Sequence, residues 1–549
     1  MPSTVETTLK RVEESFRMTP DKKASLSRRG MVATAFPDAT CAGVEMLRRG
    51  GNAVDAACAA SLALAVCEPQ ASGIGGQTIA LIHVNGRTVA IDGSSRAPSL
   101  AHSSRFTTQQ TRFLGYGAST VPSTIATIGY LNDHYGCLDW ETIVGPAIRI
   151  ARRGYRITKL QHRCQVDNLD KFLSVESRSG AKYFLKDGLT PYEVGDLFIQ
   201  EELAETLDHL GKYGYHSFYH GDMADQIDAD MRKNGGLLRK EDLVLVPTPV
   251  ERRPISRKYR GIRVSTIPPP GAGDTMLLVL MILDNIPRKY VGEKSHNSYH
   301  YLAETFRKAL LYRTQRPFDP NTYHHIANKT HLSVDFARRL ARSIKDNVDP
   351  TLPLREPPAD PEDTTHLSTM DEEGNAVSMT QSIELVYGSK AAADGLGFLY
   401  NNYMSAFEIS NPVHPFYLRP NAVPWSSVCP SIVFNGSEPW ITVGSPGSER
   451  IFSTMSLFLS RLFDEENSIY DAMARSRIHC SLGGQISLET DGAGDGLAAY
   501  LKKRGYKVNV LDRYSFYLGT IHAAMRCLTR EGFQGVADIR RDGTAEGIP

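Results

Sequence analysis

The sequence predicts a large globular protein that mixes α-helices with β-strands, and three stretches carry this prediction. Residues 53–67 form an alanine-rich helical pattern that suits close packing against a sheet. Residues 78–92 alternate as a hairpin does, with its turn at Asn85-Gly86. Residues 364–383 read as two strands joined by a glycine turn. A chain of 549 residues can form two or three domains or one large α/β unit.

The composition excludes several classes of partner. Apolar residues make up 41% and charged residues 22% of the chain, which is a globular balance with ample material for a core. The 62 Lys and Arg nearly cancel the 61 Asp and Glu, so we expect neither nucleic acid nor an anionic membrane as partner. The sequence contains no Cys-x-x-Cys and no His-Glu-x-x-His, and we expect no metal and no cofactor.

The cysteines and the N-terminal segment indicate in which compartment of the cell the protein works. Eight cysteines are scattered without a disulfide framework, and Cys58 and Cys67 lie in apolar sequence that belongs in the core. Residues 1–23 are polar and lack the apolar region of a signal peptide. The longest apolar run, 56–67, is too short to span a bilayer. We therefore expect a cytoplasmic protein.

Taken in order, the chain begins with a disordered or loosely helical arm over 1–28, followed by a strand at 30–35. Residues 103–345 are mostly helical, and 353–361 form a proline-rich stretch that we expect to be exposed and mobile. A glycine turn at 444–450 opens a helix. The other elements that the pattern predicts are helices at 39–49, 140–154, 201–213, 276–283, 299–313 and 451–462, and strands at 260–267 and 440–443.

Thr364 lies where the exposed proline-rich stretch meets a buried strand. A threonine hydroxyl is a weak nucleophile, but a threonine that chain cleavage makes N-terminal carries its own base, the α-amino group. That amine titrates at about 7.7–8.0 in model compounds, close to working pH. Cleavage between Asp363 and Thr364 would create it. The alternative interpretation is that Thr364-Thr365 is β-branched strand sequence without a catalytic role.

Residues 363–368, together with Asp371 and 374–378, resemble the autoprocessing site of the γ-glutamyltranspeptidase family. The resemblance extends over about residues 30–545. Four further stretches carry it, namely 50–57 followed by 68–69 and 72–76, 397–404, 444–450, and 537–543.

The resemblance implies a fold and a division of the chain. Members of this family are N-terminal-nucleophile hydrolases, made as one chain and cut into two subunits. They have a four-layer αββα sandwich. By this resemblance residues 1–29 are an N-terminal arm, 30–363 the large subunit and 364–549 the small subunit, with both subunits intertwined in one structural unit. Thr364 is then the self-cleaving residue and the catalytic nucleophile. The sequence leaves open whether the protein forms a homo-oligomer.

The resemblance also assigns supporting residues. Gly447 and Ser448 fall where the family has paired backbone N–H donors for the oxyanion, usually on two glycines; a serine still supplies an N–H. Ser382 falls where a hydroxyl binds the new amine, and Thr365 is a second supporting candidate. We interpret His366 as a packed, hydrogen-bonded residue rather than a general base.

The substrate contacts depart from the family. Ser426 and Ser427 match serines that contact the substrate's carboxylate end. The clamping arginine of the family falls at Ser94, so we consider Arg96, two residues later, as its replacement. The family's acid for the substrate amine falls at Ala406.

Two further contact positions also differ, because Tyr403 and Glu384 stand where the family has glutamine-type and asparagine-type residues. A buried ammonium without a partner binds poorly, so we expect glutathione to be a poor substrate.

Three hypotheses follow. In the first, the enzyme forms an acyl ester on Thr364 and passes a small acyl group, oxamate-like or from another dicarboxylic monoamide, to water or an amine. In the second, it is a γ-glutamyltransferase or glutathione hydrolase with a clamp rearranged around Arg96 and Glu384. In the third, it is an uncleaved, non-catalytic binding protein. The first two predict a small-molecule amide substrate.

Overall fold

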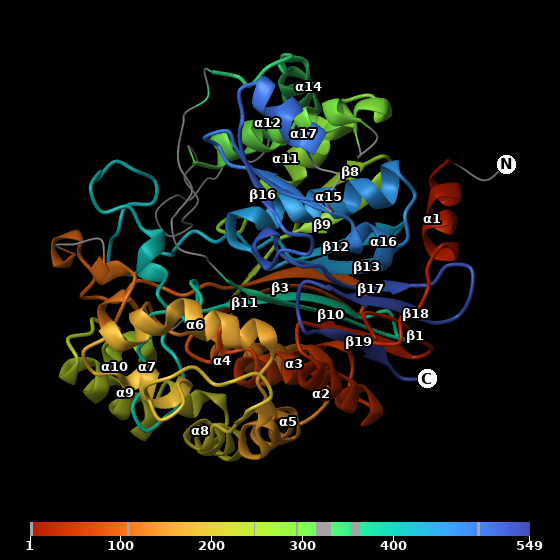
Figure 1. Ribbon diagram of the computed structural model, residues 1–549. Helices are drawn as coiled ribbons and strands as arrows, with labels where there is room; N and C mark the ends of the chain where they lie inside the picture. Colours follow the sequence, from red (N-terminus) through yellow and green to blue (C-terminus); the bar gives the residue numbers. More distant parts are fainter. Residues whose placement is uncertain are drawn as a thin grey trace.

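The computed structural model describes residues 4–106, 110–245, 248–291, 295–314, 331–350, 352, 363–490 and 495–549. Within these residues, two seven-stranded sheets lie face to face between two helical layers, as Figure 1 shows. Neighbouring strands in both sheets are antiparallel. The predicted four-layer αββα sandwich is confirmed.

The strands of each sheet come from distant parts of the chain. Sheet I runs in the order β1 (Ala24–Ser27), β18 (Phe533–Ala537), β17 (His522–Arg526), β13 (Glu438–Gly444), β12 (Ser431–Asn435), β9 (Ile262–Thr266) and β8 (Ile255–Tyr259). Sheet II runs in the order β19 (Thr544–Gly547), β2 (Gly30–Thr34), β10 (Thr365–Asp371), β11 (Ala376–Ser382), β3 (Gln77–Val84), β4 (Arg87–Gly93) and β7 (Val250–Arg252). Both sheets therefore combine strands from either side of Thr364, and the two predicted subunits share one core.

Alternation along the strands separates two hydrophobic cores. On β2, Met31 and Ala33 face the core that contains sheet I, whereas Val32 faces the core that contains α3 (Ala53–Cys67). Every residue of α3 is buried, and its alanines let the helix pack closely against β10 and β11. The helix begins at Asn52 with a capping box. Its first N–H, on Ala53, also donates to the Asp371 carboxylate at 2.8 Å, which fixes the helix against the end of β10.

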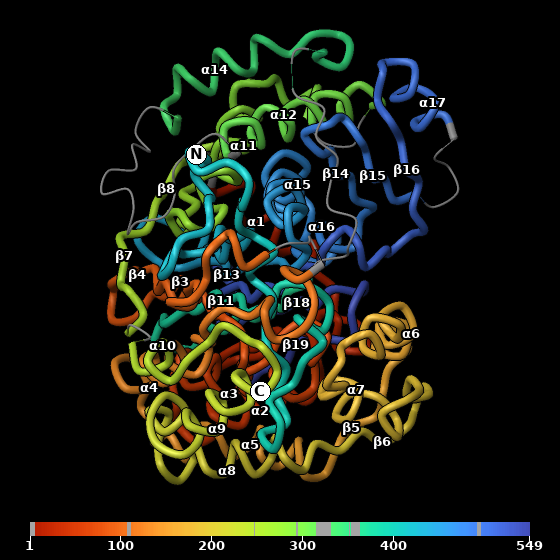
Figure 2. Tube along the Cα trace, turned by 90° about the vertical axis from the view of Figure 1, so that its left-hand side faces the viewer, coloured from red at the N-terminus to blue at the C-terminus, as the bar shows by residue number. Residues whose placement is uncertain are grey.

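The helices form two outer layers, which Figure 2 shows from the side. The lower layer in Figure 1 contains α2 (Pro37–Arg48), α3, α4 (Thr124–Tyr135), α5 (Trp140–Arg153), α6 (Lys159–Ser174), α7 (Ser179–Phe184), α8 (Glu201–Tyr213), α9 (Asp222–Lys233) and α10 (Lys240–Val244). The upper layer contains α11 (Gly273–Asp284), α12 (His296–Thr314), α14 (Val334–Arg342), α15 (Ile451–Asp464), α16 (Ile469–Ala474) and α17 (Asp495–Lys503).

Smaller elements lie at the margins. Strands β14 (Ile478–Cys480), β15 (Gln485–Glu489) and β16 (Lys507–Leu511) form a three-stranded sheet in which β15 and β16 are parallel. Strands β5 (Tyr155–Arg156) and β6 (Leu197–Phe198) form a short pair.

The N-terminal arm is helical in part, as one alternative of the sequence prediction has it, but it also contributes a strand that we did not predict. Residues 4–14 form the helix α1 (Thr4–Glu14), and residues 24–27 form β1 at the edge of sheet I, paired with β18. The proline-rich stretch 353–361, which we predicted to be exposed, lies outside the described residues. Cys58 and Cys67 are buried, as predicted.

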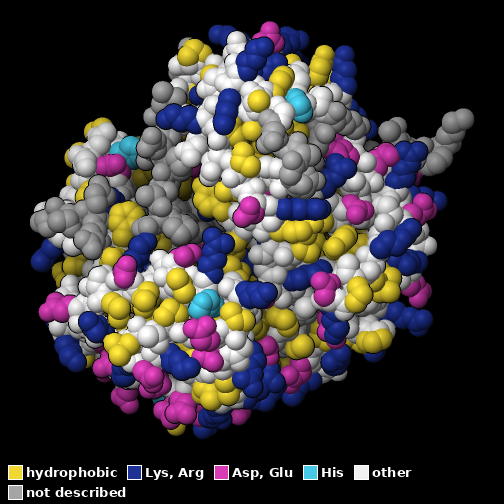
Figure 3. Space-filling model, viewed as in Figure 1, with side chains coloured by type: hydrophobic (Ala, Val, Ile, Leu, Met, Phe, Trp, Pro, Cys, Tyr) yellow, Lys and Arg dark blue, Asp and Glu magenta, His cyan; other side chains and the backbone are white. Residues whose placement is uncertain are grey.

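Charged side chains of both signs are interspersed over the face of the molecule seen in Figure 3, on the upper and the lower helical layers alike. Among the residues that the structure describes, no helix has the length and hydrophobicity needed to cross a membrane.

Candidate active site

Thr364 lies directly before β10, a central strand of sheet II, and is only 5% exposed. Its hydroxyl donates a hydrogen bond to Ser382 Oγ at 3.3 Å. Ser382, the last residue of β11, in turn donates to the carbonyl oxygen of Asp363 at 3.0 Å. One serine hydroxyl therefore lies between the Thr364 hydroxyl and the carbonyl of the peptide bond that precedes Thr364.

The backbone of Glu384 holds this arrangement in place. Its N–H donates to Ser382 Oγ at 2.8 Å, and its carbonyl accepts the N–H of Asp363 at 3.1 Å. Glu384 makes both contacts with φ at +81°, a conformation that costs a non-glycine residue about 1–3 kcal/mol and that clusters at functional sites. The two hydrogen bonds hold the Asp363–Thr364 peptide against the end of β11.

A cavity that is partly open to solvent lies in front of Thr364, and the space between its walls, open solvent included, is about 290 Å³. Six of the residues that we predicted for the site border it. The lining consists of Thr364, Glu384, Tyr403, Trp425, Ser426, Ser427, Val428 and Ser448. The structure thus brings together the predicted nucleophile, one oxyanion candidate and four of the five predicted substrate contacts.

The turn at Gly447 and Ser448 presents backbone donors beside this cavity. It precedes a short 3-10 helix, residues 448–450, that leads into α15. Within the described part of the chain, neither N–H has an acceptor, as expected for the first groups of a helix. Gly447 adopts φ +121°, and a Cβ there would lie 2.8 Å from Gly519 Cα. Ser448 adopts φ +55°, where glycine would be unstrained.

Trp425 is a wall of the cavity that we did not predict. Its ring stacks on Phe416 with centroids 6.0 Å apart, and the Arg313 guanidinium lies 4.7 Å from its centroid. Arg313 also donates to the carbonyl of Ser426 at 2.5 Å, so one arginine fixes two neighbouring wall residues. In the sequence, Trp425 is a single tryptophan before Ser426-Ser427. Nothing in the local pattern distinguishes a tryptophan that lines a cavity from one that packs in the core.

Arg96 lies outside this cavity. It borders a second one, together with Ser94, Asp92 and Arg252 of the β4–β7 edge. There the hydroxyl of Ser94 donates to Asp92 at 2.5 Å, and Arg252 forms an ion pair with Asp92 at 2.6 Å. The predicted replacement clamp is therefore not assembled around Thr364 in this conformation.

His366 and Thr365 are structural neighbours of the nucleophile. Both are fully buried on β10. The His366 ring lies between the hydroxyls of Thr380, at 2.8 Å, and Ser368, at 3.1 Å. Burial lowers the pKa of His366 to about 3, so the ring stays neutral. A Cβ at Gly444 would lie 2.2 Å from this ring, which explains a glycine there. The geometry agrees with a packed histidine.

A buried ion cluster adjoins the peptide between Asp363 and Thr364. Arg541 donates to Asp363 Oδ1 and to Glu68 Oε1, and all three residues are at most 5% exposed. Asp363 Oδ1 also accepts the N–H of Thr364 at 2.8 Å. Burial raises the pKa of Glu68 to about 7 and that of Asp363 to about 6, while Arg541 opposes both shifts.

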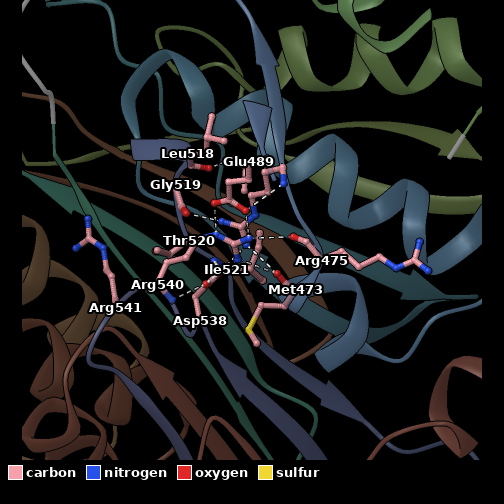
Figure 4. A network of polar contacts seen from close by, with 12 residues as sticks. Met473, Arg475, Glu489, Leu518, Gly519, Thr520, Ile521, Asp538, Arg540 and Arg541 are labelled. Atoms are coloured by element: carbon pink, nitrogen blue, oxygen red, sulfur yellow. Dashed lines mark hydrogen bonds and ion pairs between the residues drawn. The ribbon is translucent and has the colours of Figure 1, made fainter. Parts of the chain in front are cut away.

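A second network fixes the chain segment that carries Arg541, as Figure 4 shows. Asp538 pairs with Arg477 and, at 3.2 Å, with Arg540, which also binds Glu489 at 2.5 Å. Burial acts to raise the pKa of Asp538, but the two arginines hold it well below its usual range. Arg540 and Arg541 are consecutive yet bind different partners, and in Figure 4 Arg541 lies apart from the network.

The sequence model described as gamma-glutamyltranspeptidase matches residues 39–548. The chain belongs to the γ-glutamyltranspeptidase family. It is accordingly an N-terminal-nucleophile threonine hydrolase made as a proenzyme. Among relatives, the glutathione hydrolase proenzyme of Escherichia coli K12 is 33% identical over 515 residues, covering 88% of this chain and 86% of that protein. The acylase ACY 1 proenzyme of Pseudomonas sp. V22 is 29% identical over 553 residues, covering 96% and 95%.

Solved structures of the family confirm the fold. The cephalosporin acylase of Bacillus halodurans superposes with a TM-score of 0.87 at 28% identity, covering 98% of this chain and 99% of its own. The γ-glutamyltranspeptidase of Helicobacter pylori, at 33% identity, covers 58% of this chain and 92% of that one with a TM-score of 0.54.

Proposed function

We propose that the protein is a self-cleaving amidohydrolase whose nucleophile is Thr364 and whose cut lies between Asp363 and Thr364. One observation carries this proposal: the hydrogen-bond chain from Thr364 Oγ through Ser382 Oγ to the carbonyl oxygen of Asp363. That chain joins the attacking hydroxyl to the oxygen that becomes negative during attack, which is the arrangement acyl transfer needs.

Self-cleavage then proceeds by acyl transfer to oxygen. Thr364 Oγ bonds to the Asp363 carbonyl carbon and gives its proton to Ser382, which gives its own proton to the carbonyl oxygen. As the C–N bond breaks, the former carbonyl oxygen releases that proton and the nitrogen takes one up, so the number of protons is unchanged and the α-amine of Thr364 is released. Water hydrolyses the resulting ester, which leaves a carboxylate on Asp363 and a free hydroxyl on Thr364.

The mature enzyme repeats the chemistry on an external amide. The Thr364 amine acts as base for its own hydroxyl. The acyl group then occupies the cavity beside Ser448, and the free N–H groups of the turn receive the oxyanion. The acyl ester passes to water or to an amine. Thr365 and Gly447 support this site from the backbone of β10 and of the turn.

Mass spectrometry and N-terminal sequencing test the proposal directly. The parent should yield fragments of 363 and 186 residues, the smaller beginning Thr364-Thr365-His366, and a Thr364→Ala variant should stay intact. A single uncut chain in both preparations would favour the non-catalytic binding protein instead, and a bound ligand would then be sought by native mass spectrometry.

For the substrate, we propose a small acyl amide other than a γ-glutamyl compound, such as an oxamate-like or other dicarboxylic monoamide. Ser94 stands where the family has its clamping arginine, and Arg96 borders a different cavity. The hydroxyls of Ser426 and Ser427 border the cavity and can bind a carboxylate end. The chain is similar to acylases along nearly its whole length, which supports the same class of substrate.

Glu384 favours a second candidate, a γ-glutamyl-type substrate. It is the one carboxylate among the described lining residues of the cavity, and it would attract an ammonium and repel an anionic acyl group. Hydrolysis rates for γ-glutamyl-p-nitroanilide, glutathione and succinamate separate the candidates. Faster turnover of succinamate supports the first. Faster turnover of the γ-glutamyl pair, lost in Glu384→Gln, supports the second.

We propose a reducing, cytoplasmic location as well. All eight cysteines are thiols, and Cys41 and Cys137 are exposed, where an oxidising compartment would leave them open to oxidation. Fractionation of the source cells with an antibody to the protein tests this.

A further inference from the structure

The cluster of Glu68, Arg541 and Asp363 adjoins the peptide bond that the proposed self-cleavage breaks. It takes no part in the hydrogen-bond chain through Ser382. Asp363 contributes two groups to the site: its carbonyl is attacked, and its side chain lies at the nitrogen that must leave, with Oδ1 2.8 Å from Thr364 N. Arg541, near the end of the chain, binds that side chain, and Glu68, which follows α3, binds Arg541.

We propose that the Asp363 carboxyl is the proton donor to the departing Thr364 nitrogen, and that Arg541 and Glu68 position it. This inference rests on the proposed self-cleavage at Thr364. In the step, the carboxyl turns so that its protonated oxygen, Oδ2, meets the nitrogen. The C–N bond of the tetrahedral intermediate breaks as the nitrogen takes this proton, and the former carbonyl oxygen releases to solvent the proton that it received through Ser382. The ester to Thr364 Oγ and the Asp363 carboxylate remain. Hydrolysis of the ester by water then completes the cut without any further reactant.

Three features of the cluster fit a proton donor. First, a poor leaving group such as an amide nitrogen needs a proton, and positioned acids typically contribute about 10²–10⁴-fold to such steps. Second, Asp363 Oδ2 is buried and has no hydrogen-bond partner within the described residues, so it can hold the proton. Third, two carboxylates share one guanidinium, and like charges in a dry site favour the protonated form of one of them.

The surroundings of Asp363 make its protonation adjustable. Burial raises its pKa to about 6, in a range where a proton donor works near neutral pH. Arg541 and, further off, Arg450 act to lower this pKa, while Glu68 beside Arg541 offsets part of the arginine's charge. The titratable and charged groups that face Asp363 are Arg541, Glu68, Arg450, Cys164 and Tyr387.

The experiment follows self-cleavage of the full chain after cell-free synthesis, by intact mass, at pH values from about 5.5 to 8. Asp363→Asn keeps the size of the side chain and an oxygen for the Thr364 N–H, but removes the acid. We expect its cleavage rate to fall about 100-fold, and the decline of the parent's rate above about pH 6 to disappear.

We expect variants of the two positioning residues to shift the pH profile of cleavage in opposite directions. A merely structural role would not produce such shifts. Glu68→Gln removes a negative neighbour, so the pKa of Asp363 falls and the pH profile of cleavage shifts to lower pH by about one unit. Arg541→Gln removes the positive neighbour and the clamp, so the rate falls about tenfold and the profile shifts to higher pH. Arg541→Lys keeps the charge and should recover part of the rate.

A matched control separates this effect from loss of stability. Arg307 and Glu304 form an ion pair that is as deeply buried, on α12. Arg307→Gln should lower the melting temperature at least as much as Arg541→Gln while its cleavage rate stays within about twofold of the parent. Cleavage of Asp363→Asn at the parent rate would overturn the inference and leave Thr364 as nucleophile untouched. A parent that never cleaves would overturn the proposed function itself.

Discussion

Removing the hydroxyl of Ser382 should stop self-cleavage while leaving the fold in place. The Ser382→Ala change removes three hydrogen bonds at once: the bond accepted from Thr364 at 3.3 Å, the bond accepted from the Glu384 N–H at 2.8 Å, and the bond donated to the Asp363 carbonyl at 3.0 Å. The cost to stability is about 1–3 kcal/mol, because the Glu384 N–H is left buried without its partner. The cost to cleavage is larger, about 10²–10³-fold, because the proton path and the donor to the developing oxyanion are both lost.

Ser378 provides the control on the same strand. It lies four residues before Ser382 on β11, so the two side chains face the same way. It is equally buried, donates to the Val443 carbonyl at 2.9 Å and accepts the Ser431 N–H at 2.9 Å. Ser378→Ala should therefore lose a similar amount of stability, measured by urea unfolding, and cleave at the parent rate, measured by intact mass. Equal cleavage rates in the two variants would refute the assignment of Ser382.

Three further predictions concern the cavity and the core. Ser448→Gly should raise the melting temperature, since relief of φ +55° is worth about 1–2 kcal/mol and the added freedom of the unfolded chain costs about 0.4–1 kcal/mol; the cleavage rate should not fall. Trp425→Ala should raise KM for the best amide substrate about tenfold, because it removes the aromatic wall, while self-cleavage measured by mass is unchanged. Acid should destabilise the protein, because burial lowers the pKa of His366 and of His479 to about 3 from 6.5. Their contribution to stability is present above about pH 6.5 and is lost as the pH falls toward 3, because the unfolded chain then binds more protons. Urea unfolding between about pH 7 and 4 measures it, and a flat stability over that range would contradict the neutral buried rings.

Much of the fold was predictable from local signals. The helix α3 begins and ends where the alanine run predicts, because its small residues and its Asn52 cap act within the helix itself. The hairpin of β3 and β4 turns at Asn85 and Gly86, both with positive φ, as the dipeptide requires. Six of the eight residues that line the cavity follow from the family resemblance, whereas Trp425 and Val428 do not.

Other features depend on partners far away in the sequence. Residues 24–27 carry no strong strand signal and become β1 because β18, about five hundred residues later, offers an open edge. Arg96 was expected at the nucleophile from its position after β4, but the chain there pairs with Val121 and turns it toward a second cavity. The stacking of Trp425 depends on Phe416 and could be seen only in three dimensions.

The direction of maturation follows from the same long-range contacts. In the precursor, Arg541 must satisfy two buried carboxylates, and an excess negative charge in a dry site is costly. The proposed cleavage would make Asp363 a chain end, and its side chain could then leave Arg541 paired with Glu68 alone. The precursor is thus less stable at this point than the mature enzyme, increasingly so as pH rises through about 7 and Glu68 ionises. On this argument the proposed cut removes an unfavourable charge from beside the bond that it breaks. A precursor fixed by Thr364→Ala should lose stability between pH 6 and 8 in urea, and Glu68→Gln in that background should abolish the loss.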